Sequence, residues 1–382
     1  MQYRPFGKLD WKGSALGFGA MRLPVINRDQ AKIDEDLALE MIRTAIDQGV
    51  NYVDTAFPYH GGQSEIVVGK ALAGEYREKV KLATKAPTWL IQKQDDFDRY
   101  LEEQLKKLNT NRIDFYLLHG LNKQRWPGLK EMNIFKPAEK AMADGRIGYF
   151  GFSFHDDLET FKGIVDDYDN WTFAQIQYNF MDTEYQAGTE GLQYAAAKGL
   201  AMVIMEPVRG GQLAKRPPDG VARIWEEAKI KRSSAEWALQ WIWNQPEVAV
   251  VLSGMSTMEQ VKENLESANR SGVGNLSPTE TNLIQKAAEA YRASSPILCT
   301  QCQYCMPCPN GVNIPGVFGL YNDAMIYNDV GRARMLYQMR LTKETQAHNC
   351  VACGECLEKC PQSIEIIEWL KKADETLVPK QA

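Results

Sequence analysis

The sequence has no cysteine before Cys299, and all eight of its cysteines lie in two short runs between Cys299 and Cys360. Cysteines that served as ordinary core residues would be scattered along the chain. A disulfide framework is unusual in an intracellular chain of 382 residues. The clustering therefore indicates metal binding.

Long apolar runs are also missing. No stretch of about 18 consecutive apolar residues occurs, and the N-terminal segment MQYRPFGKLDW has no apolar core behind a basic start. We therefore expect no membrane span, no secretory signal and a cytoplasmic protein. The formal net charge of −5 gives no reason to expect a nucleic-acid partner or an anionic membrane partner.

Strand-like and helix-like stretches alternate over most of the chain. Helix-like segments such as DFDRYLEEQLKKL separate short runs of β-branched and apolar residues. Strands are expected at 15–23, 51–56, 80–85, 113–120, 147–153, 173–179, 201–207 and 248–254. Strict alternation implies a parallel sheet, and eight such units close naturally into a (β/α)₈ TIM barrel. The start of the chain, before the first of these strands, is expected to form a short hairpin.

The alternative fold is a doubly wound open sheet, which periodicity alone does not exclude. The G-x-G-x-x-G fingerprint of such sheets is absent after the first expected strand, where GFG at 17–19 continues differently. We expect an α/β protein with the barrel over residues 1–293. A Ser-Ser-Pro break then opens a small, mainly α-helical cysteine domain over 294–382, with helices expected within 310–349 and near the end of the chain.

Four polar residues lie at or just after the ends of successive expected strands: Asp54, Tyr59, Lys85 and His119. Strand ends of a parallel barrel meet on one rim, where barrel active sites lie. Hydride reduction of a carbonyl needs a proton donor for the developing alkoxide, and Tyr59 has the chemistry for it. Lys85 would lower the pKa of Tyr59 from its reference value of about 10. Asp54 would hold Lys85, and His119 would donate to the substrate oxygen.

In order and placement, these four residues resemble the catalytic tetrad of the aldo-keto reductase superfamily, over roughly residues 1 to 290. The resemblance implies a barrel that reduces aldehydes or ketones with a nicotinamide cofactor. It also implies that loops after several strands hold that cofactor. The residues that it assigns to the cofactor are Gly19, Met21, Arg22, Ser153, Gln175, Tyr178, Ser253, Gly254, Ser256, Gln260, Glu263 and Asn264.

The choice between NADP and NAD depends on the segment SGMSTMEQVKEN. Members of the family that prefer NADPH carry basic residues there, at positions matched here by Gly254 and Gln260. A 2′-phosphate usually pairs with a cation. The absence of Lys or Arg at these two positions makes NADH plausible.

The cysteine runs have a specific spacing. The second run, Cys350-x2-Cys353-x2-Cys356-x3-Cys360-Pro, is that of bacterial ferredoxins, in which the fourth cysteine binds the other of two [4Fe–4S] clusters. In the first run, the gap before the last cysteine is one residue shorter than in the second run. We therefore assign Cys299, Cys302, Cys305 and Cys360 to one cluster and Cys308, Cys350, Cys353 and Cys356 to the other. Structural zinc is the alternative, since C-x2-C pairs also bind it.

Two functions are consistent with these patterns. The first is an NAD(P)-dependent oxidoreductase that interconverts a small carbonyl compound and an alcohol, with clusters that exchange electrons with a ferredoxin or flavoprotein, or that only stabilise the fold. The second is an electron-transfer protein whose barrel is a docking or cofactor-sensing module. Hydride transfer moves two electrons and each cluster moves one. A flavin would connect the two, but no flavin signature is evident.

Overall fold

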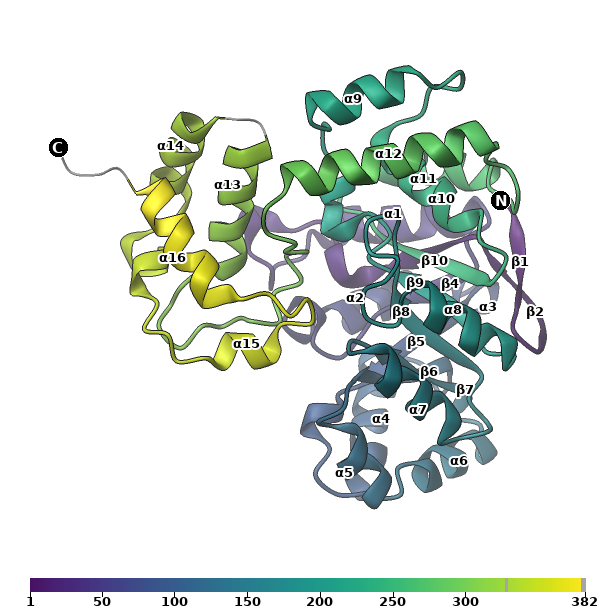
Figure 1. Ribbon diagram of the computed structural model, residues 1–382. Helices are drawn as coiled ribbons and strands as arrows, with labels where there is room; N and C mark the ends of the chain where they lie inside the picture. The colour runs from purple at the N-terminus through teal and green to yellow at the C-terminus, as the bar shows by residue number, and fades with distance from the viewer. Residues whose placement is uncertain (327–328, 379–382) are drawn as a thin grey trace. The chain divides into compact units, whose positions relative to one another are not determined.

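The computed structural model describes residues 1–326 and 329–378. The chain divides into two compact units, Met1–Pro207 with Ala238–Ser277 and Val208–Trp237 with Pro278–Ala382 (Figure 1). The domain boundary between 293 and 294 stays a prediction, since this division follows compactness.

The first unit contains a closed barrel of eight parallel strands in the order β10-β3-β4-β5-β6-β7-β8-β9. The strands are β3 (Leu16–Gly19), β4 (Tyr52–Asp54), β5 (Lys81–Ala86), β6 (Ile113–Leu121), β7 (Ile147–Phe154), β8 (Phe173–Gln177), β9 (Ala201–Met205) and β10 (Val248–Gly254). Each overlaps one of the eight expected strands. The prediction of a (β/α)₈ barrel is confirmed, and the open sheet is excluded because β10 pairs with β3.

Apolar residues on both faces of the strands hold the barrel together. Its interior is filled by a cluster that includes Tyr52, Phe115 and Phe173, and the predicted N-terminal hairpin of β1 (Tyr3–Phe6) and β2 (Leu9–Ser14) contributes Phe6 to the same cluster. The Phe6 and Phe115 rings lie 4.7 Å apart. The other strand face packs against the surrounding helices in a larger core. Side chains alternate between the two faces of a strand. Because both faces are buried here, the strand sequences are nearly continuous runs of apolar residues.

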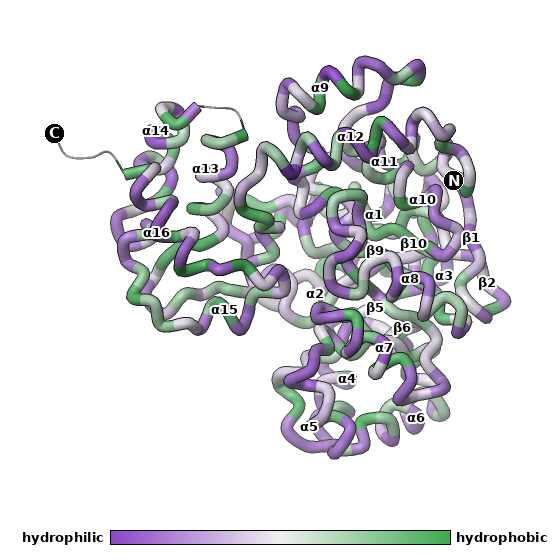
Figure 2. Tube along the Cα trace, in the orientation of Figure 1, coloured by the Kyte–Doolittle hydropathy of each residue, from purple (hydrophilic) through white to green (hydrophobic). Residues whose placement is uncertain are grey.

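Helices follow the strands as expected, and hydrophobic and hydrophilic residues are interspersed along them (Figure 2). Apolar residues of these helices, such as Met41 and Ile42, are buried. Asp34 and Asp157 cap two of them by accepting hydrogen bonds from backbone amides. The helices that lie within this unit are α1 (Glu35–Asp47), α2 (Ser64–Ala71), α3 (Tyr76–Lys79), α4 (Asp95–Lys107), α5 (Trp126–Glu131), α6 (Phe135–Ala143), α7 (Leu158–Asp166), α8 (Gly188–Ala197) and α11 (Met258–Asn269). Helix α10 (Ser234–Trp243) runs from the second unit into the first.

The second unit is helical in its described residues. Its helices are α9 (Asp219–Glu226), α12 (Pro278–Ser294), α13 (Ile314–Ile326), α14 (Val330–Arg340), α15 (Glu355–Lys359) and α16 (Ile366–Leu377). The predicted mainly helical character is confirmed, although the expected helical stretch at 310–349 includes 327–328, which lie outside the described residues. A separate apolar core joins α13, α14 and α16, with Phe318, Tyr337 and Leu370 among its members.

That core also positions the two cysteine runs. The side-chain amide of Asn322 on α13 exchanges two hydrogen bonds with the backbone of Ile297, two residues before the first cysteine. The Tyr337 hydroxyl on α14 accepts from the backbone N–H of Ala347, three residues before Cys350. The loops that carry the cysteines are therefore tied to the helices at their starts.

No helix in the part of the chain that the structure describes is both long enough and apolar enough to cross a membrane.

Candidate functional site

Three of the four tetrad residues meet directly at the carboxyl ends of β4 and β5. The Lys85 ammonium donates to Asp54 Oδ1 at 2.5 Å, to the carbonyl of Thr55 at 2.8 Å and to the Tyr59 hydroxyl at 3.3 Å. Asp54 and Lys85 are almost fully buried. Burial raises the pKa of Asp54 and lowers that of Lys85, while their ion pair opposes both shifts. Gln175 completes the pair by donating to Asp54 Oδ2 at 3.1 Å.

His119, the fourth residue, lies edge-on to Tyr59, with ring centroids 6.0 Å apart. It is 3% exposed, and its Nδ1 has no hydrogen-bond partner within residues 1–326 and 329–378. Burial and the nearby Lys85 charge hold the His119 pKa well below its ordinary range, so the imidazole is neutral at physiological pH. A buried imidazole of this kind is suited to hydrogen-bond a ligand oxygen.

The expectation that Lys85 lowers the pKa of Tyr59 is wrong for this structure. Burial of the phenol, together with the charges of Asp54 and Glu206, raises the Tyr59 pKa well above 10, and Arg22 opposes that shift only in part. The Lys85 charge is already balanced by Asp54 at 2.5 Å. Tyr59 therefore holds its proton at neutral pH, which suits a proton donor in the direction of reduction.

For the interconversion of a carbonyl compound and an alcohol that the sequence predicts, these pKa directions lead us to expect different pH profiles in the two directions. Between pH 7 and 9, His119 stays neutral and Tyr59 stays protonated, so kcat for carbonyl reduction should be nearly constant. Alcohol oxidation needs the phenolate as base, and because the Tyr59 pKa lies well above 10, its kcat should still be rising with pH at about pH 10. Steady-state rates in both directions check this, and a tenfold fall in the reduction rate over that range would contradict it.

A hydrogen-bonded network behind Lys85 was not predicted. The buried carboxylate of Glu65 accepts from Thr84 at 2.7 Å and from Gln104 at 2.5 Å, and Gln104 also donates to the backbone carbonyl of Lys85 at 3.1 Å. Tyr116 donates to the amide oxygen of Gln104. The network fixes the backbone from which Lys85 projects. No local sequence pattern marks this network, because its side chains come from α2, α4, β5 and β6.

His60 likewise holds the loop that carries Tyr59. It accepts from the backbone N–H of Leu23 at 3.1 Å, and its other ring nitrogen lies 2.8 Å from the carbonyl of Gln30. The loop after β3 and the 3-10 helix η3 (Tyr59–Gly62) are thereby joined. Ser64, at the start of α2, adds a second link by donating to the carbonyl of Ala20.

Two of the residues expected to bind the nicotinamide lie at the carboxyl ends of β7 and β8. Ser153, on β7, accepts from the backbone N–H of Gly120 at 2.8 Å. Tyr178 follows β8, with its hydroxyl 2.9 Å from that of Thr189 and its ring 5.0 Å from Trp241. Both are almost fully buried.

The segment after β10 and the loop after β3 lie side by side. The Ser256 hydroxyl donates to the carbonyl of Arg22, and a Cβ at Gly254 would come within 3.2 Å of the Arg22 side chain. At Gly19 a Cβ would lie 3.3 Å from the carbonyl of Ser253. Glycine at these two positions therefore lets the two segments approach each other closely.

Helix α11 opens beside this segment. Thr257 caps the helix by accepting from the Gln260 backbone, and the Gln260 side chain accepts from the N–H of Ser256 at 2.8 Å. Asn264 donates to Ser253 at 3.0 Å. Met21 lies on the 3-10 helix η1 (Ala20–Arg22) and Glu263 on α11. Hydrogen bonds among themselves hold Ser253, Ser256, Gln260 and Asn264 close together, and the assignment of these residues to a dinucleotide stays a prediction.

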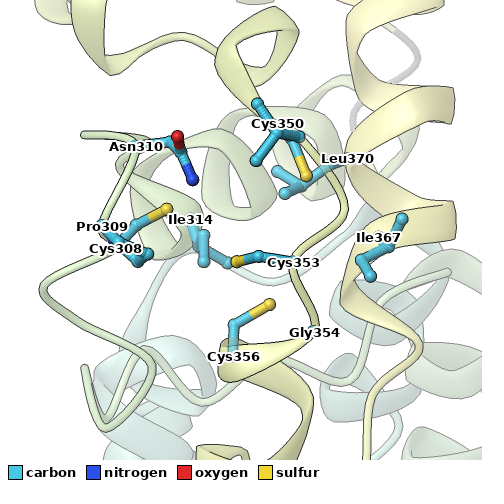
Figure 3. Close-up of a pocket in the computed structure, with 11 residues that line it drawn as sticks. Cys308, Pro309, Asn310, Ile314, Cys350, Cys353, Gly354, Cys356, Ile367 and Leu370 are labelled. Carbon is cyan, nitrogen blue, oxygen red and sulfur yellow. The ribbon is translucent and has the colours of Figure 1, made fainter.

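The cysteines gather around two separate hollows in the second unit, in the combination expected from the spacing. Cys308, Cys350, Cys353 and Cys356 line one hollow, and their sulfur atoms point into it (Figure 3). Cys299, Cys302, Cys305 and Cys360 line the other. Ile314 lines both. Each hollow is therefore lined by cysteines from both sequence runs.

Crowding of the thiols affects their acidity. Burial raises the pKa of Cys305 to about 12, with added repulsion from the other three cysteines of its hollow. Burial also raises the pKa of Cys356, with smaller contributions from Cys350, Cys353 and Cys308. Four thiolates at one site need positive charge among them, and the iron of a cluster would supply it.

Comparison with known proteins identifies both parts. The sequence profile of the aldo/keto reductase family matches residues 15–289. This chain belongs to that family. The profile of a 4Fe-4S dicluster domain matches residues 298–365. The protein is therefore an aldo/keto reductase family oxidoreductase with a ferredoxin-type domain, and the combination implies a nicotinamide cofactor and two [4Fe–4S] clusters rather than zinc.

Relatives match the reductase over most of their length. The chain is 29% identical over 307 residues to the uncharacterized oxidoreductase YqkF of Bacillus subtilis, covering 70% of this chain and 92% of that one. It is 25% identical over 342 residues to the NADH-specific methylglyoxal reductase of Escherichia coli, covering 76% and 99%. Among solved structures, the holo form of aldo-keto reductase AKR11C1 from Bacillus halodurans superposes with a TM-score of 0.62 at 27% identity, covering 75% of this chain and 96% of that one.

Proposed function

We propose that this reductase interconverts a small carbonyl compound and an alcohol, with Tyr59 as the proton donor. The convergence of Tyr59, Lys85 and Asp54 carries the proposal, together with the neighbouring His119 Nδ1, which has no hydrogen-bond partner in the described part of the chain. A barrel that only docked or sensed a cofactor would have no need for this ion pair. The enzyme is therefore favoured over the electron-transfer protein with a docking barrel.

Reduction adds a hydride to the carbonyl carbon and a proton to its oxygen. A bound nicotinamide cofactor supplies the hydride, and the residues proposed to hold it are Gly19, Met21, Arg22, Ser153, Gln175, Tyr178, Ser253, Gly254, Ser256, Gln260, Glu263 and Asn264. His119 donates a hydrogen bond to the carbonyl oxygen, and Tyr59 then transfers its proton to that oxygen. Lys85 steadies the phenolate that remains, and Asp54 keeps Lys85 charged and in place.

NADH is the proposed cofactor. Neither Gly254 nor Gln260 offers the cation that a 2′-phosphate usually needs. The Gln260 side chain is exposed and lies against the N–H of Ser256. A relative with 25% identity is named as NADH-specific.

Gln260→Arg should therefore strengthen NADPH binding. A charge-assisted hydrogen bond to the 2′-phosphate corresponds to about a tenfold or greater fall in the Kd for NADPH. The affinity for NADH should change little. Titration of the protein's fluorescence with each cofactor measures both constants, and Gln260→Leu is the matched control because it removes the amide without adding charge. Wild-type protein that binds NADPH more tightly than NADH would contradict the proposal.

The clusters are proposed to form a one-electron relay to an external ferredoxin or flavoprotein. Each of the two cysteine sets lies around its own hollow, and Ile314 lines both. A purely structural role could be met by one site, because cluster binding already ties a loop to its surroundings. A flavin, bound or supplied by the partner, would connect single electrons with hydride chemistry.

A further inference from the structure

Thr300 is a buried polar residue that the roles described so far leave aside. It lies directly after Cys299 and lines the Cys299 hollow, which Cys302, Cys305 and Cys360 complete. The residue is 1% exposed, and its hydroxyl has no hydrogen-bond partner within the part of the chain that the structure describes. Buried hydroxyl groups are hydrogen-bonded in nearly all proteins, so this donor needs an acceptor.

The surroundings of Thr300 are mainly apolar. Phe318 and Ile366 line the same hollow and belong to the buried core of the second unit. Gln303 and Gln362 line it too, but Gln303 is exposed and Gln362 has interactions of its own. An electrostatic contact is screened less in such surroundings than in water. A hydroxyl here therefore gains most from an acceptor that carries negative charge.

The second cysteine run makes the same turn with a different residue in this place. In both runs the residue two positions after the first cysteine has a left-handed backbone, with φ of 57° at Gln301 and 56° at Ala352. Val351 therefore has the place in its turn that Thr300 has in the first. Val351 lines the other hollow and is 66% exposed. The first turn thus differs from the second by a hydroxyl group and by its burial.

The first turn also directs a second donor at a cysteine. The backbone N–H of Gln301 donates to Cys299 Sγ at 3.4 Å. Hydrogen bonds to the sulfur atoms of a cluster are one of the factors that set its reduction potential. The turn that carries Thr300 is therefore built in a way that can influence the electronic state of a cluster.

We propose that the Thr300 hydroxyl donates a hydrogen bond to a sulfur atom of the [4Fe–4S] cluster held in the Cys299 hollow and thereby raises the reduction potential of that cluster. Reduction takes one electron from an external donor, which is itself oxidised by one electron, and no atom is transferred. The added negative charge strengthens the hydrogen bond, so the bond favours the reduced cluster over the oxidised one. The inference rests on the clusters that the proposed relay uses and assigns to one of them a residue that sets its potential.

Thr300→Val is the test, in full-length protein prepared without oxygen. Valine has nearly the shape of threonine but no hydroxyl. The protein is reduced stepwise with titanium(III) citrate and mediator dyes, and electron paramagnetic resonance measures each cluster. The signal that remains in Cys356→Ala belongs to the Cys299 hollow, because Cys356 lines the other hollow. Loss of the hydrogen bond should lower the reduced-to-oxidised ratio of this cluster about three- to tenfold, which is a fall of about 30–60 mV in midpoint potential.

Two further variants are the controls. Thr300→Ser keeps the hydroxyl and should keep the potential close to that of the wild type. Thr376, on α16, donates its hydroxyl to the backbone carbonyl of Lys372 and is not among the described residues that line either hollow. Thr376→Val should therefore leave both potentials unchanged. An unchanged potential in Thr300→Val, or an equal shift of both clusters, would overturn the inference.

Iron content shows whether each variant holds both clusters, which requires about eight iron per chain. Thr300→Ala removes the same hydroxyl with a smaller side chain and serves as a second test. Loss of one cluster in Thr300→Val and Thr300→Ala, with Thr300→Ser fully loaded, would support a contact between the hydroxyl and the cluster. Loss of the cluster in Thr300→Ser as well would count against it.

The same measurement separates this inference from the proposed relay, since mediator dyes exchange electrons with the clusters directly. A lowered potential in Thr300→Val, in protein that ferredoxin does not reoxidise, would support the hydrogen bond and reject the relay. Equal potentials in Thr300→Val and wild type would reject the hydrogen bond whether or not ferredoxin reacts. Wild-type clusters that titanium(III) citrate does not reduce would reject both.

Discussion

Replacing Tyr59 with phenylalanine should lower kcat for carbonyl reduction by about 10²–10⁴-fold, the usual contribution of a general acid. The substitution removes only the hydroxyl that receives the Lys85 hydrogen bond at 3.3 Å. The ring can still lie against His119, so the pocket keeps its shape. Binding of the nicotinamide cofactor should be nearly unchanged, because Tyr59 is the proton donor in this proposal and is not among the residues assigned to the cofactor.

Tyr168→Phe is the control for this experiment. The Tyr168 hydroxyl also donates to a neighbour, Glu139 at 3.1 Å, but at an exposed position. Its loss should leave the rate near that of wild type. Stopped-flow measurement of NADH oxidation, with cofactor affinity measured separately, distinguishes a chemical defect from a binding defect. A Tyr59→Phe enzyme that kept more than half of the wild-type rate would remove Tyr59 from the mechanism.

Protein prepared without oxygen should be brown and contain about eight iron and eight sulfide per chain, as two cubanes require. The physical basis is the placement of four sulfur atoms around each hollow. Cys356→Ala should reduce the iron content to about four, because it removes a ligand from one hollow only. Elemental analysis that found zinc, with no absorption in the iron–sulfur region, would reject the clusters.

Cys360→Ala tests whether the last cysteine of the second run binds the cluster of the first run, as proposed, or the cluster of its own run. Cys360 is in the same sequence run as Cys350, Cys353 and Cys356, but it lines the hollow of the other set. Electron paramagnetic resonance of the two reduced variants should therefore show loss of different clusters. The same spectrum lost in both would mean that each run holds its own cluster.

The proposed electron relay can be tested by reducing and then reoxidising the two clusters. Dithionite should add an electron to each cluster, and added ferredoxin or a flavin acceptor should remove it once excess reductant has been separated. Reduction and reoxidation are measured anaerobically from the visible absorption. Clusters that did neither within minutes would be structural, and the two hollows would then serve only to fold the second unit.

Much of this molecule could be predicted from local patterns. Each barrel strand is a short apolar run that ends in polar residues, and parallel strands must end on the same rim, so the meeting of Asp54, Lys85 and His119 followed from the strand assignment. The cysteine spacing was equally informative, because two-residue gaps place successive thiols on one side of a turn, and the structure gathers the same two sets of four.

Sequence patterns by themselves determined the barrel, the helical cysteine domain and the residue types at the proposed site, because periodicity and spacing are local properties. Only the tertiary structure decided how these residues behave. The pKa of Tyr59 rises because of burial and the charges of Asp54 and Glu206, which Arg22 opposes only in part, and that balance depends on distances no pattern encodes. The contact of Trp89 with His119 likewise joins the loop after β5 to β6. Such loops have no periodicity to read, and their side chains meet only when the barrel closes.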